Sequence, residues 1–186
     1  MREWIRPLYP VAIVLGRAHT MLMADVYEPE EGTFALQIEG IDRLRKDDVV
    51  VVASNRSTEA ALWGELLSTA ARCRGAKGAV INGLARDLRQ MEKMNFPVFA
   101  AGARPISSKG RCIATDYGCR INCGGVNVEP GDLVFGDVDG VVVVPEAVIE
   151  EAVKRGMERV SSEKVTKKEL VAGSLLKQVY EKYGTL

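Results

Sequence analysis

The sequence of 186 residues contains a single histidine, His19, and this scarcity removes several kinds of active site. A Ser-His-Asp hydrolase needs a histidine as its base. Residues 16–23 around His19 alternate between apolar and polar types, and that pattern predicts a strand. We therefore expect His19 to be a structural sheet residue whose loss leaves the chemistry intact.

Cysteine is also scarce; the four residues are Cys73, Cys112, Cys119 and Cys123. A structural zinc site normally shows two close pairs such as C-x-x-C, and these spacings do not provide them. Cys119 and Cys123 flank a strand-like segment, where they lie too far apart along one strand for an easy disulfide. The pattern favours reduced thiols and gives no support to a zinc site.

The sequence also has no long apolar run, no excess of one charge and few aromatic residues. The longest apolar run, near residues 141–145, is far too short to span a membrane, and residues 1–7 have no signal-like apolar core. The 25 basic residues are balanced by 25 acidic ones and only 6% of residues are aromatic, which disfavours direct nucleic-acid binding. We expect a soluble, cytoplasmic protein with no membrane partner, and the 47% hydrophobic content is enough for a substantial core.

The centre of the chain predicts a strand, a helix and a second strand. Residues 49–53 form an apolar, β-branched run, residues 65–74 have helical apolar spacing ending at Gly75, and residues 78–82 form another apolar run. Consecutive strands joined by a helix are normally parallel, and ligands gather beyond the carboxyl ends of such strands. The helix start at Gly64 and the pair Arg86-Asp87 are both expected at that edge.

The start of this helix is suited to a carboxylate. Its first free amides belong to Glu65, Leu66 and Leu67, with the positive end of the helix dipole behind them. Gly64 would let a ligand approach the backbone closely. Taken alone, however, Glu65 is typical of an acid that simply complements the dipole of the first helical turn.

Arg86 and Asp87 have chemically complementary roles in a 2-oxo acid site. The Arg86 guanidinium offers a rigid fork of donors for the oxygens of the acid, and it would stabilise charge developing on the keto oxygen. Asp87 is a hard oxygen ligand suited to Mg²⁺ or Mn²⁺. The structural alternative is a helix cap with a solvated neighbour, which an isolated Arg-Asp pair at a helix start usually is.

The remaining chain predicts more strands and helices. We expect strands at 11–15 and 18–23 that meet at Gly16, a helix near 34–45, a strand at 97–101 and short antiparallel strands from residue 120 onward. Asp139-Gly140 has the signature of a hairpin turn, which argues against a metal cluster of Asp137 and Asp139. A helix from Pro145 to about residue 160 precedes a helical tail, so the predicted division is one domain at 1–160 and a tail at 161–186 that packs on the domain or on another subunit.

Several separated motifs, taken in order, resemble the RraA-like family. They are WGELL at 63–67, GAVINGLARD at 78–87, FPVFA at 96–100, NCGGV at 122–126, PGD at 130–132 and DVDGV at 137–141. The resemblance runs from about residue 5 to about residue 160. It is closest to the branch of 4-hydroxy-4-methyl-2-oxoglutarate aldolases, which also decarboxylate oxaloacetate, because that branch has an aspartate where Asp87 stands and the regulators of ribonuclease E lack it.

The resemblance implies a three-layer β/β/α swivelling domain with mixed parallel and antiparallel strands, assembled as a homotrimer or homohexamer. It implies a carbon–carbon lyase, a class II pyruvate aldolase or oxaloacetate decarboxylase that uses Mg²⁺ or Mn²⁺ and takes a small 2-oxo acid. Arg86 and Asp87 would be the catalytic pair. Asp87 would bind the metal directly and Glu65 would do so through a water, while Gly64, Glu65, Leu66, Leu67 and Arg86 would bind the substrate.

Two departures from the family pattern affect this expectation. Gln90 stands where the family usually has an acid, which predicts weaker metal binding. The chain also opens almost directly on residues 6–10, whereas the family normally begins with an additional helical segment. In the aldolase branch an acid near the C-terminus of a neighbouring subunit approaches the metal, and Glu163 and Glu169 are the candidates here.

The sequence leaves two functions other than a lyase to consider. A non-catalytic protein could use the same fold to bind and inhibit a ribonuclease, as the regulatory branch does, but such a protein needs no metal ligand at Asp87. A methyltransferase acting on demethylmenaquinone is disfavoured, because no glycine-rich loop follows the first strand to hold a nucleoside cofactor.

Overall fold

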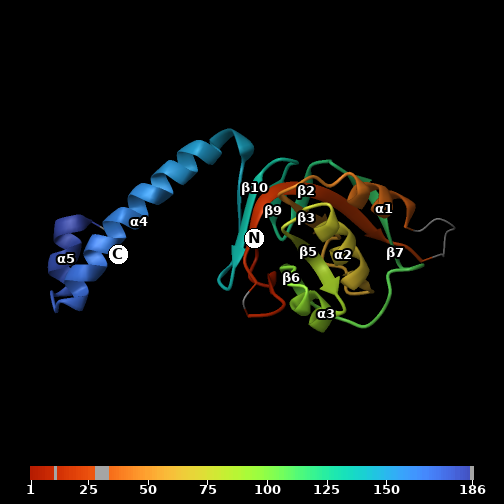
Figure 1. The fold of residues 1–186 in the computed structure, drawn as a ribbon, viewed down its shortest axis with the longest axis horizontal. Coiled ribbons are helices and arrows are strands. Elements are labelled where there is room, and N and C mark those ends of the chain that lie inside the picture. The colour runs from red at the N-terminus through yellow and green to blue at the C-terminus, as the bar shows by residue number, and fades with distance from the viewer. Residues whose placement is uncertain (11, 28–33, 185–186) are drawn as a thin grey trace. The chain divides into compact units, whose positions relative to one another are not determined.

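The computed structural model describes residues 1–10, 12–27 and 34–184, and the chain forms two compact units, Met1–Glu146 and Ala147–Leu186. The first unit is built on a nine-stranded sheet, with a separate two-stranded sheet and three helices (Figure 1). Its strands are β1 (Arg6–Pro7), β2 (Val14–Asp25), β3 (Asp48–Ala53), β4 (Ala61–Trp63), β5 (Gly78–Ala85), β6 (Val98–Ala103), β7 (Cys112–Tyr117), β8 (Ile121–Cys123), β9 (Val126–Val128), β10 (Leu133–Asp137) and β11 (Gly140–Val144). Its helices are α1 (Ala35–Asp42), α2 (Glu65–Cys73) and α3 (Leu88–Lys93).

Four parallel strands form the middle of the large sheet, in the order β6-β5-β3-β2. β3 carries four consecutive valines that are fully buried, as expected for a strand covered on both faces. Antiparallel strands extend the sheet on both sides, with β1 beside β6, and β10 and β11 beyond β2. The predicted mixture of parallel and antiparallel strands is confirmed.

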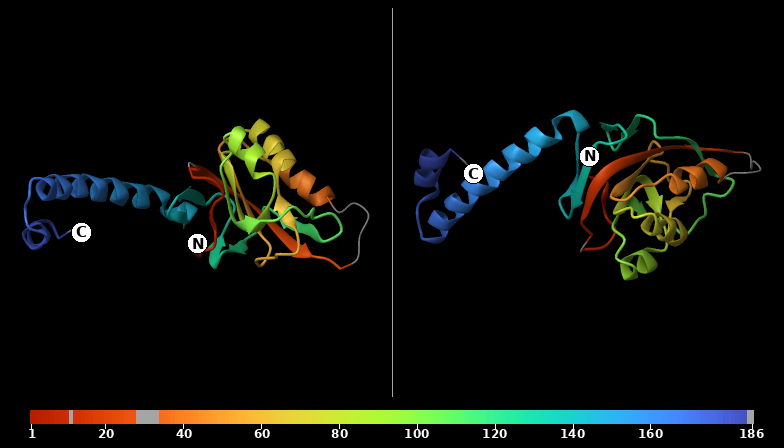
Figure 2. Two further views of the ribbon diagram at one scale, coloured as in Figure 1. Left: turned by 90° about the horizontal axis from the view of Figure 1, so that it is seen from below. Right: turned by 45° about the horizontal axis from the view of Figure 1, so that its top comes forward.

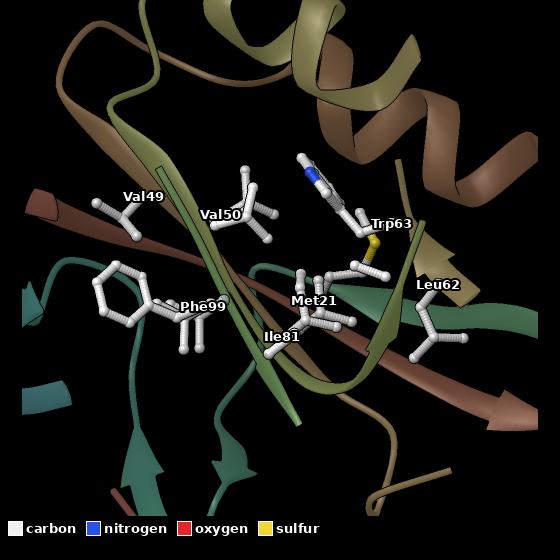
Figure 3. Close-up of a cluster of buried hydrophobic side chains, with 14 of the residues drawn as sticks. Met21, Val49, Val50, Leu62, Trp63, Ile81 and Phe99 are labelled. Carbon is white, nitrogen blue, oxygen red and sulfur yellow. The ribbon is translucent and has the colours of Figure 1, made fainter. Parts of the chain in front are cut away.

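The helices and the small sheet provide the other two layers. α2 packs on β5 and next to α1 and α3, whereas the β8–β9 hairpin packs on β2 and β3. Figure 3 shows the core between them, where Val50 and Trp63 lie near Ile81 and Met21. Burial of these apolar side chains is the main force that holds the layers together.

One strand replaces the two that were predicted at 11–15 and 18–23. β2 runs without interruption through Gly16; residue 11, where the first strand was predicted to begin, lies outside the described residues. A Cβ atom at Gly16 would lie 2.2 Å from the backbone oxygen of Asp47. Gly16 therefore marks a close approach of two backbones rather than a break in the strand.

The later strands follow the predicted antiparallel pattern. β10 and β11 form a hairpin in which Asp137 pairs with Gly140, so the turn predicted at Asp139-Gly140 is confirmed. The strands β4 and β7 were not predicted, because β4 has three residues and the mixed sequence of β7 lacks a clear alternation. β4 places the start of α2 beside β5.

The second unit, Ala147–Leu186, is helical. After a 3₁₀ turn at Glu146–Val148, it contains α4 (Ile149–Val171) and α5 (Leu176–Tyr183), drawn in blue in Figure 2. Val179 of α5 is buried, and Glu169 of α4 lies 2.7 Å from the Lys182 ammonium. The boundary predicted between residues 160 and 161 falls inside α4, whose helical pattern continues through it. Within the described part of the chain, no helix is both long enough and apolar enough to cross a membrane.

Candidate functional site

Three parallel strands end side by side at one edge of the large sheet. β4 and β6 both pair with β5, and the last residues Trp63, Ala85 and Ala103 are aligned across the three strands. The residues that follow these ends are Gly64 and Glu65 after β4, Arg86 and Asp87 after β5, and Arg104 after β6. The predicted meeting of the helix start with the Arg-Asp pair is therefore found in the structure.

The strand ends are fixed by buried contacts. The Arg86 amide donates to the Trp63 carbonyl at 2.9 Å, and the Arg104 amide donates to the Ala85 carbonyl at 2.9 Å. The Trp63 indole is buried, donates to the Ser68 hydroxyl at 2.7 Å, and stacks on Phe96. These bonds hold the first turn of α2 against the segment that carries Arg86.

Asp87 adopts a left-handed backbone conformation, with φ of 62° and ψ of 35°. It stands at the N-cap position of α3, but its side chain does not cap that helix. Its Oδ2 atom instead accepts a hydrogen bond from the Glu65 amide at 3.2 Å, and lies 3.5 Å from Arg86 Nε. Asp87 therefore does not cap its own helix α3; its carboxylate instead accepts the first free amide of α2.

The start of α2 remains open to a second anionic group. The first bond within the helix joins the Ser68 amide to the Gly64 carbonyl at 3.0 Å, so the amides of Leu66 and Leu67 have no partner in the helix. The Glu65 amide, which was also expected to face a substrate carboxylate, is engaged by Asp87. Two amides and the positive end of the helix dipole are left for a ligand.

Gly64 is required by the crowding at this point. A Cβ atom there would lie 2.7 Å from Asp87 Oδ2 and 3.0 Å from Arg86 Cγ. The backbone is extended, so the constraint is steric and does not arise from a special conformation. The absence of a side chain at Gly64 allows the acid, the arginine and the helix start to converge.

Two cavities meet at Arg86 and Asp87. The first, of about 310 Å³, has a largely apolar wall from α1, β4 and α2 that includes Phe34, Ile38 and Leu66. The second, of about 290 Å³, lies toward α3 and β6 and is lined by Arg104 in addition to the shared pair. Figure 1 shows α1, α2 and α3 around this part of the sheet.

Sequence reasoning did not identify the α1 residues or Arg104. The contribution of α1 depends on packing between elements distant in the chain. Arg104, however, follows the strand next to β5, as Arg86 follows β5 itself. Extending the rule about carboxyl strand ends to the third strand would have found it.

Asp87 and Glu65 are the carboxylates that could bind a divalent metal in this site. Among the described residues, no three His, Cys, Asp or Glu side chains are grouped closely enough to hold a metal ion. Asp87 nevertheless has its Oδ1 atom without a partner in the described part of the chain, and Glu65 lines the same cavity. Mg²⁺ commonly binds through one or two carboxylates with water and substrate oxygens as its other ligands. These residues fit a metal of that type.

The remaining acids named from the family pattern have other neighbours. Glu163 is paired with Arg159 at 2.7 Å, and Glu169 with Lys182, both inside the second unit. Position 90 is an exposed glutamine on α3 whose backbone amide donates to the Asp87 carbonyl at 3.1 Å. It adds no negative charge beside Asp87.

A family model described as RraA-like, Aldolase/RraA, matches residues 1–143 of the chain. The chain belongs to the RraA-like family. The matched residues end close to the boundary of the first compact unit, so they contain every residue of the candidate site.

Solved structures agree with the fold. Streptomyces coelicolor RraAS2, described as an unusual member of the RNase ES inhibitor RraA protein family, superposes with a TM-score of 0.80 at 25% identity, over 89% of this chain and 82% of that one.

Curated relatives of the RraA-like chain include proteins of different lengths. Protein DlpA of Legionella pneumophila is 32% identical over 96% of this chain, and the uncharacterized protein MJ0644 of Methanocaldococcus jannaschii is 33% identical over 70%. The chain spans 29% of the length of DlpA and 62% of that of MJ0644. A protein of Halalkalibacterium halodurans named "Putative 4-hydroxy-4-methyl-2-oxoglutarate aldolase" is 30% identical, over 83% of this chain and 70% of its own length.

Proposed function

We propose that this RraA-like protein is a divalent-metal-dependent carbon–carbon lyase that releases pyruvate from 2-oxo acids. The substrate class is that of 4-hydroxy-4-methyl-2-oxoglutarate and oxaloacetate, in keeping with the names of several relatives. The observation that carries the proposal is the convergence of Arg86, Asp87 and the open start of α2 on one pair of cavities.

Arg86 is suited to hold the pyruvyl part of the substrate. Its side chain is 40% exposed, and apart from the contact with Asp87 it makes no ion pair or side-chain hydrogen bond in the described part of the chain. Its remaining N–H groups are therefore available for a carboxylate or a keto oxygen. The amides of Leu66 and Leu67 provide a second group of donors nearby for the carboxylate.

The reaction breaks the bond between C3 and C4 of the substrate. The electron pair of that bond moves into the pyruvyl part, where the negative charge is shared with the keto oxygen as an enolate. Arg86 stabilises this charge as it develops, and protonation at C3 gives pyruvate. A divalent metal held by Asp87 would act as a Lewis acid on the same oxygen. The other product is carbon dioxide from oxaloacetate, or a second pyruvate when the 4-hydroxyl group gives its proton to water as the bond breaks. In both reactions the proton added at C3 comes from water.

The two cavities divide the substrate between them. The smaller cavity holds Arg104, whose Nη1 atom donates to the Thr58 carbonyl and whose other N–H groups have no partner among the described residues. A second substrate carboxylate would be attracted to this side. The larger cavity has an apolar wall suited to methyl or methylene groups.

The test measures pyruvate release from both substrates, with Mg²⁺ or Mn²⁺ and with a chelator. The variant Asp87→Asn removes the metal-binding charge, and asparagine tolerates the left-handed backbone of this position better than alanine does. Asp47→Asn is the matched control, because Asp47 is also left-handed, with φ of 70°, but lies before β3 at the opposite edge of the parallel strands.

Metal-dependent turnover that falls on the order of 10²-fold in Asp87→Asn and persists in Asp47→Asn would support the lyase. Equal turnover in both variants would show that Asp87 has no part in the reaction. If folded wild-type protein releases no pyruvate from either substrate, the lyase proposal fails and the regulatory alternative, inhibition of a ribonuclease by protein binding, becomes the one to test.

A further inference from the structure

A third cavity lies at the amino ends of the parallel strands, on the opposite edge of the sheet from Arg86 and Asp87. Its volume is about 670 Å³. It is lined by residues of β2, the connection from α1 to β3, the turn after β7 and the loop before β10. The residues that bear charge or a titratable ring are Arg17, His19, Arg43, Arg45, Lys46, Asp48, Tyr117 and Glu146.

Backbone hydrogen bonds fix the walls of this cavity. The Gly131 amide donates to the Ala18 carbonyl at 3.0 Å, and the Gly118 amide donates to the Thr20 carbonyl at 2.9 Å. The Arg17 amide donates to the Asp47 carbonyl at 3.0 Å. Each wall is thus tied to β2, so the cavity is part of the folded sheet and not a gap between loose loops.

Positive charge prevails in the lining. Four cationic side chains stand against two acids, Asp48 and Glu146. Arg17 lies 3.7 Å from Glu146 and Arg43 lies 3.7 Å from Glu39, whereas Arg45 and Lys46 are exposed and make no ion pair within the described part of the chain. Because like charges repel, such an arrangement favours an anion that several of these side chains can share.

His19 lines the cavity beside these charges. Its side chain is 13% exposed, and it is stacked on Tyr117 with ring centroids 6.2 Å apart. Its Nε2 atom is buried and is the one buried side-chain nitrogen or oxygen without a hydrogen-bond partner among the described residues. Burial lowers the pKa of His19, while Asp48 at 4.0 Å and a hydrogen bond with the Gly40 backbone act in the opposite direction. Because Nε2 is buried from solvent, it is out of reach of a ligand in the cavity, and His19 serves only as part of the cavity lining.

We propose that this cavity binds a small phosphorylated anion, with Arg45 and Lys46 on its phosphate oxygens and the His19 ring in its lining. The volume accommodates a molecule of the size of a diphosphate or a sugar phosphate. The site lies at the other edge of the sheet from the proposed lyase site, so it is a separate binding site that does not depend on the lyase proposal.

The probe is inorganic pyrophosphate, titrated into the full-length protein. Since His19 is the only histidine in the chain, its ring gives one set of imidazole signals in an NMR spectrum and reports on this cavity without further assignment. Affinity is measured by calorimetry in parallel. The test variant is Arg45→Gln/Lys46→Gln, and the matched control is Lys154→Gln/Lys168→Gln, which removes the same charge from exposed positions of α4.

The expected result is saturable binding that shifts the His19 signals with the same dissociation constant as calorimetry gives. Affinity should fall at least about tenfold in Arg45→Gln/Lys46→Gln and change less than about twofold in the control. No saturable binding in the millimolar range would overturn the proposal. Binding without a shift of His19, or equal weakening in both double variants, would place the anion elsewhere. Tighter binding of a single-stranded oligonucleotide to the same cavity would overturn the assignment to a small ligand.

Discussion

The substitution Gly64→Ala tests the geometry of the candidate site without removing any of its charges. The added methyl group would lie 2.7 Å from Asp87 Oδ2, whereas ordinary contact begins at 3.4 Å. The carboxylate must therefore retreat by about 0.7 Å. Its bond to the Glu65 amide, at 3.2 Å, would be lengthened beyond hydrogen-bonding distance by that movement.

The effect on stability is expected to be small and the effect on activity large. Asp87 is 36% exposed, so loss of this bond costs about 1 kcal/mol, which lowers Tm by about 2–4 °C in a chain of this size. A displacement near 1 Å of a group that positions the substrate reduces kcat/KM by about 10²-fold. Pyruvate release is followed by coupling to NADH oxidation with lactate dehydrogenase, and unfolding is followed by circular dichroism.

Gly156→Ala is the control for this experiment. Gly156 lies inside α4, and no atom stands within 4 Å of the position its Cβ would occupy. This change is expected to stabilise α4 by about 0.5–1 kcal/mol and to leave turnover unchanged. Wild-type kcat/KM in Gly64→Ala would refute the reasoning, because the crowded approach of Asp87 to α2 would then be irrelevant to catalysis.

Four more outcomes are expected. Arg86→Lys lowers kcat/KM on the order of 10²-fold with both substrates, since an ammonium lacks the forked donors of a guanidinium. An unchanged kcat/KM would show that Arg86 takes no part in the reaction. Arg104→Gln raises KM for oxaloacetate and leaves kcat within about threefold, the pattern of lost ground-state binding. Gly16→Ala lowers the free energy of unfolding by about 1–3 kcal/mol, as measured by urea denaturation, because its methyl group meets the Asp47 carbonyl. A thiol reagent at pH 8 labels the exposed Cys73 quickly and Cys112 hardly at all, because burial and Asp25 raise the pKa of Cys112 to about 12. Rapid labelling that persists in the Cys73→Ser variant would contradict this.

The fold was predicted best where the sequence pattern is local. Local patterns of a few residues were enough to predict three features. They are the run of valines in β3, the spacing of apolar residues in α2 and the turn at Asp139-Gly140. The continuous strand β2 was missed because Gly16 was interpreted as a break, and only its contact with Asp47 shows why a glycine stands there. β4 was missed because three residues carry no period.

The candidate site was predicted in outline from the rule that ligands gather at carboxyl strand ends. That rule brought Gly64 and Arg86 to one place. It could not show that Asp87 turns away from its own helix and accepts a bond from the Glu65 amide, since this depends on the left-handed backbone at Asp87. Nor could it show the apolar wall from α1, which belongs to a distant part of the chain.

Two aspartates in the same left-handed conformation show why such a site cannot be assigned from residue type alone. Asp47 has φ of 70° and Asp87 has φ of 62°, and each borders a strand of the parallel sheet. The Asp47 carboxylate pairs with Lys77 at 2.9 Å, and this hydrogen bond lowers its pKa. Its charge is thereby neutralised by a surface partner.

Asp87 has a different setting at the other edge. Its nearest cation is Arg86 Nε at 3.5 Å, and an amide at a helix start holds only one of its two oxygens. The other oxygen has no partner in the described part of the chain and is open to water or to a ligand. The same substitution to asparagine is thus expected to lower metal-dependent turnover on the order of 10²-fold at Asp87 and to remove only a surface ion pair, without loss of turnover, at Asp47. Equal losses of turnover at the two positions would mean that the measured activity depends on overall stability and not on this edge of the sheet.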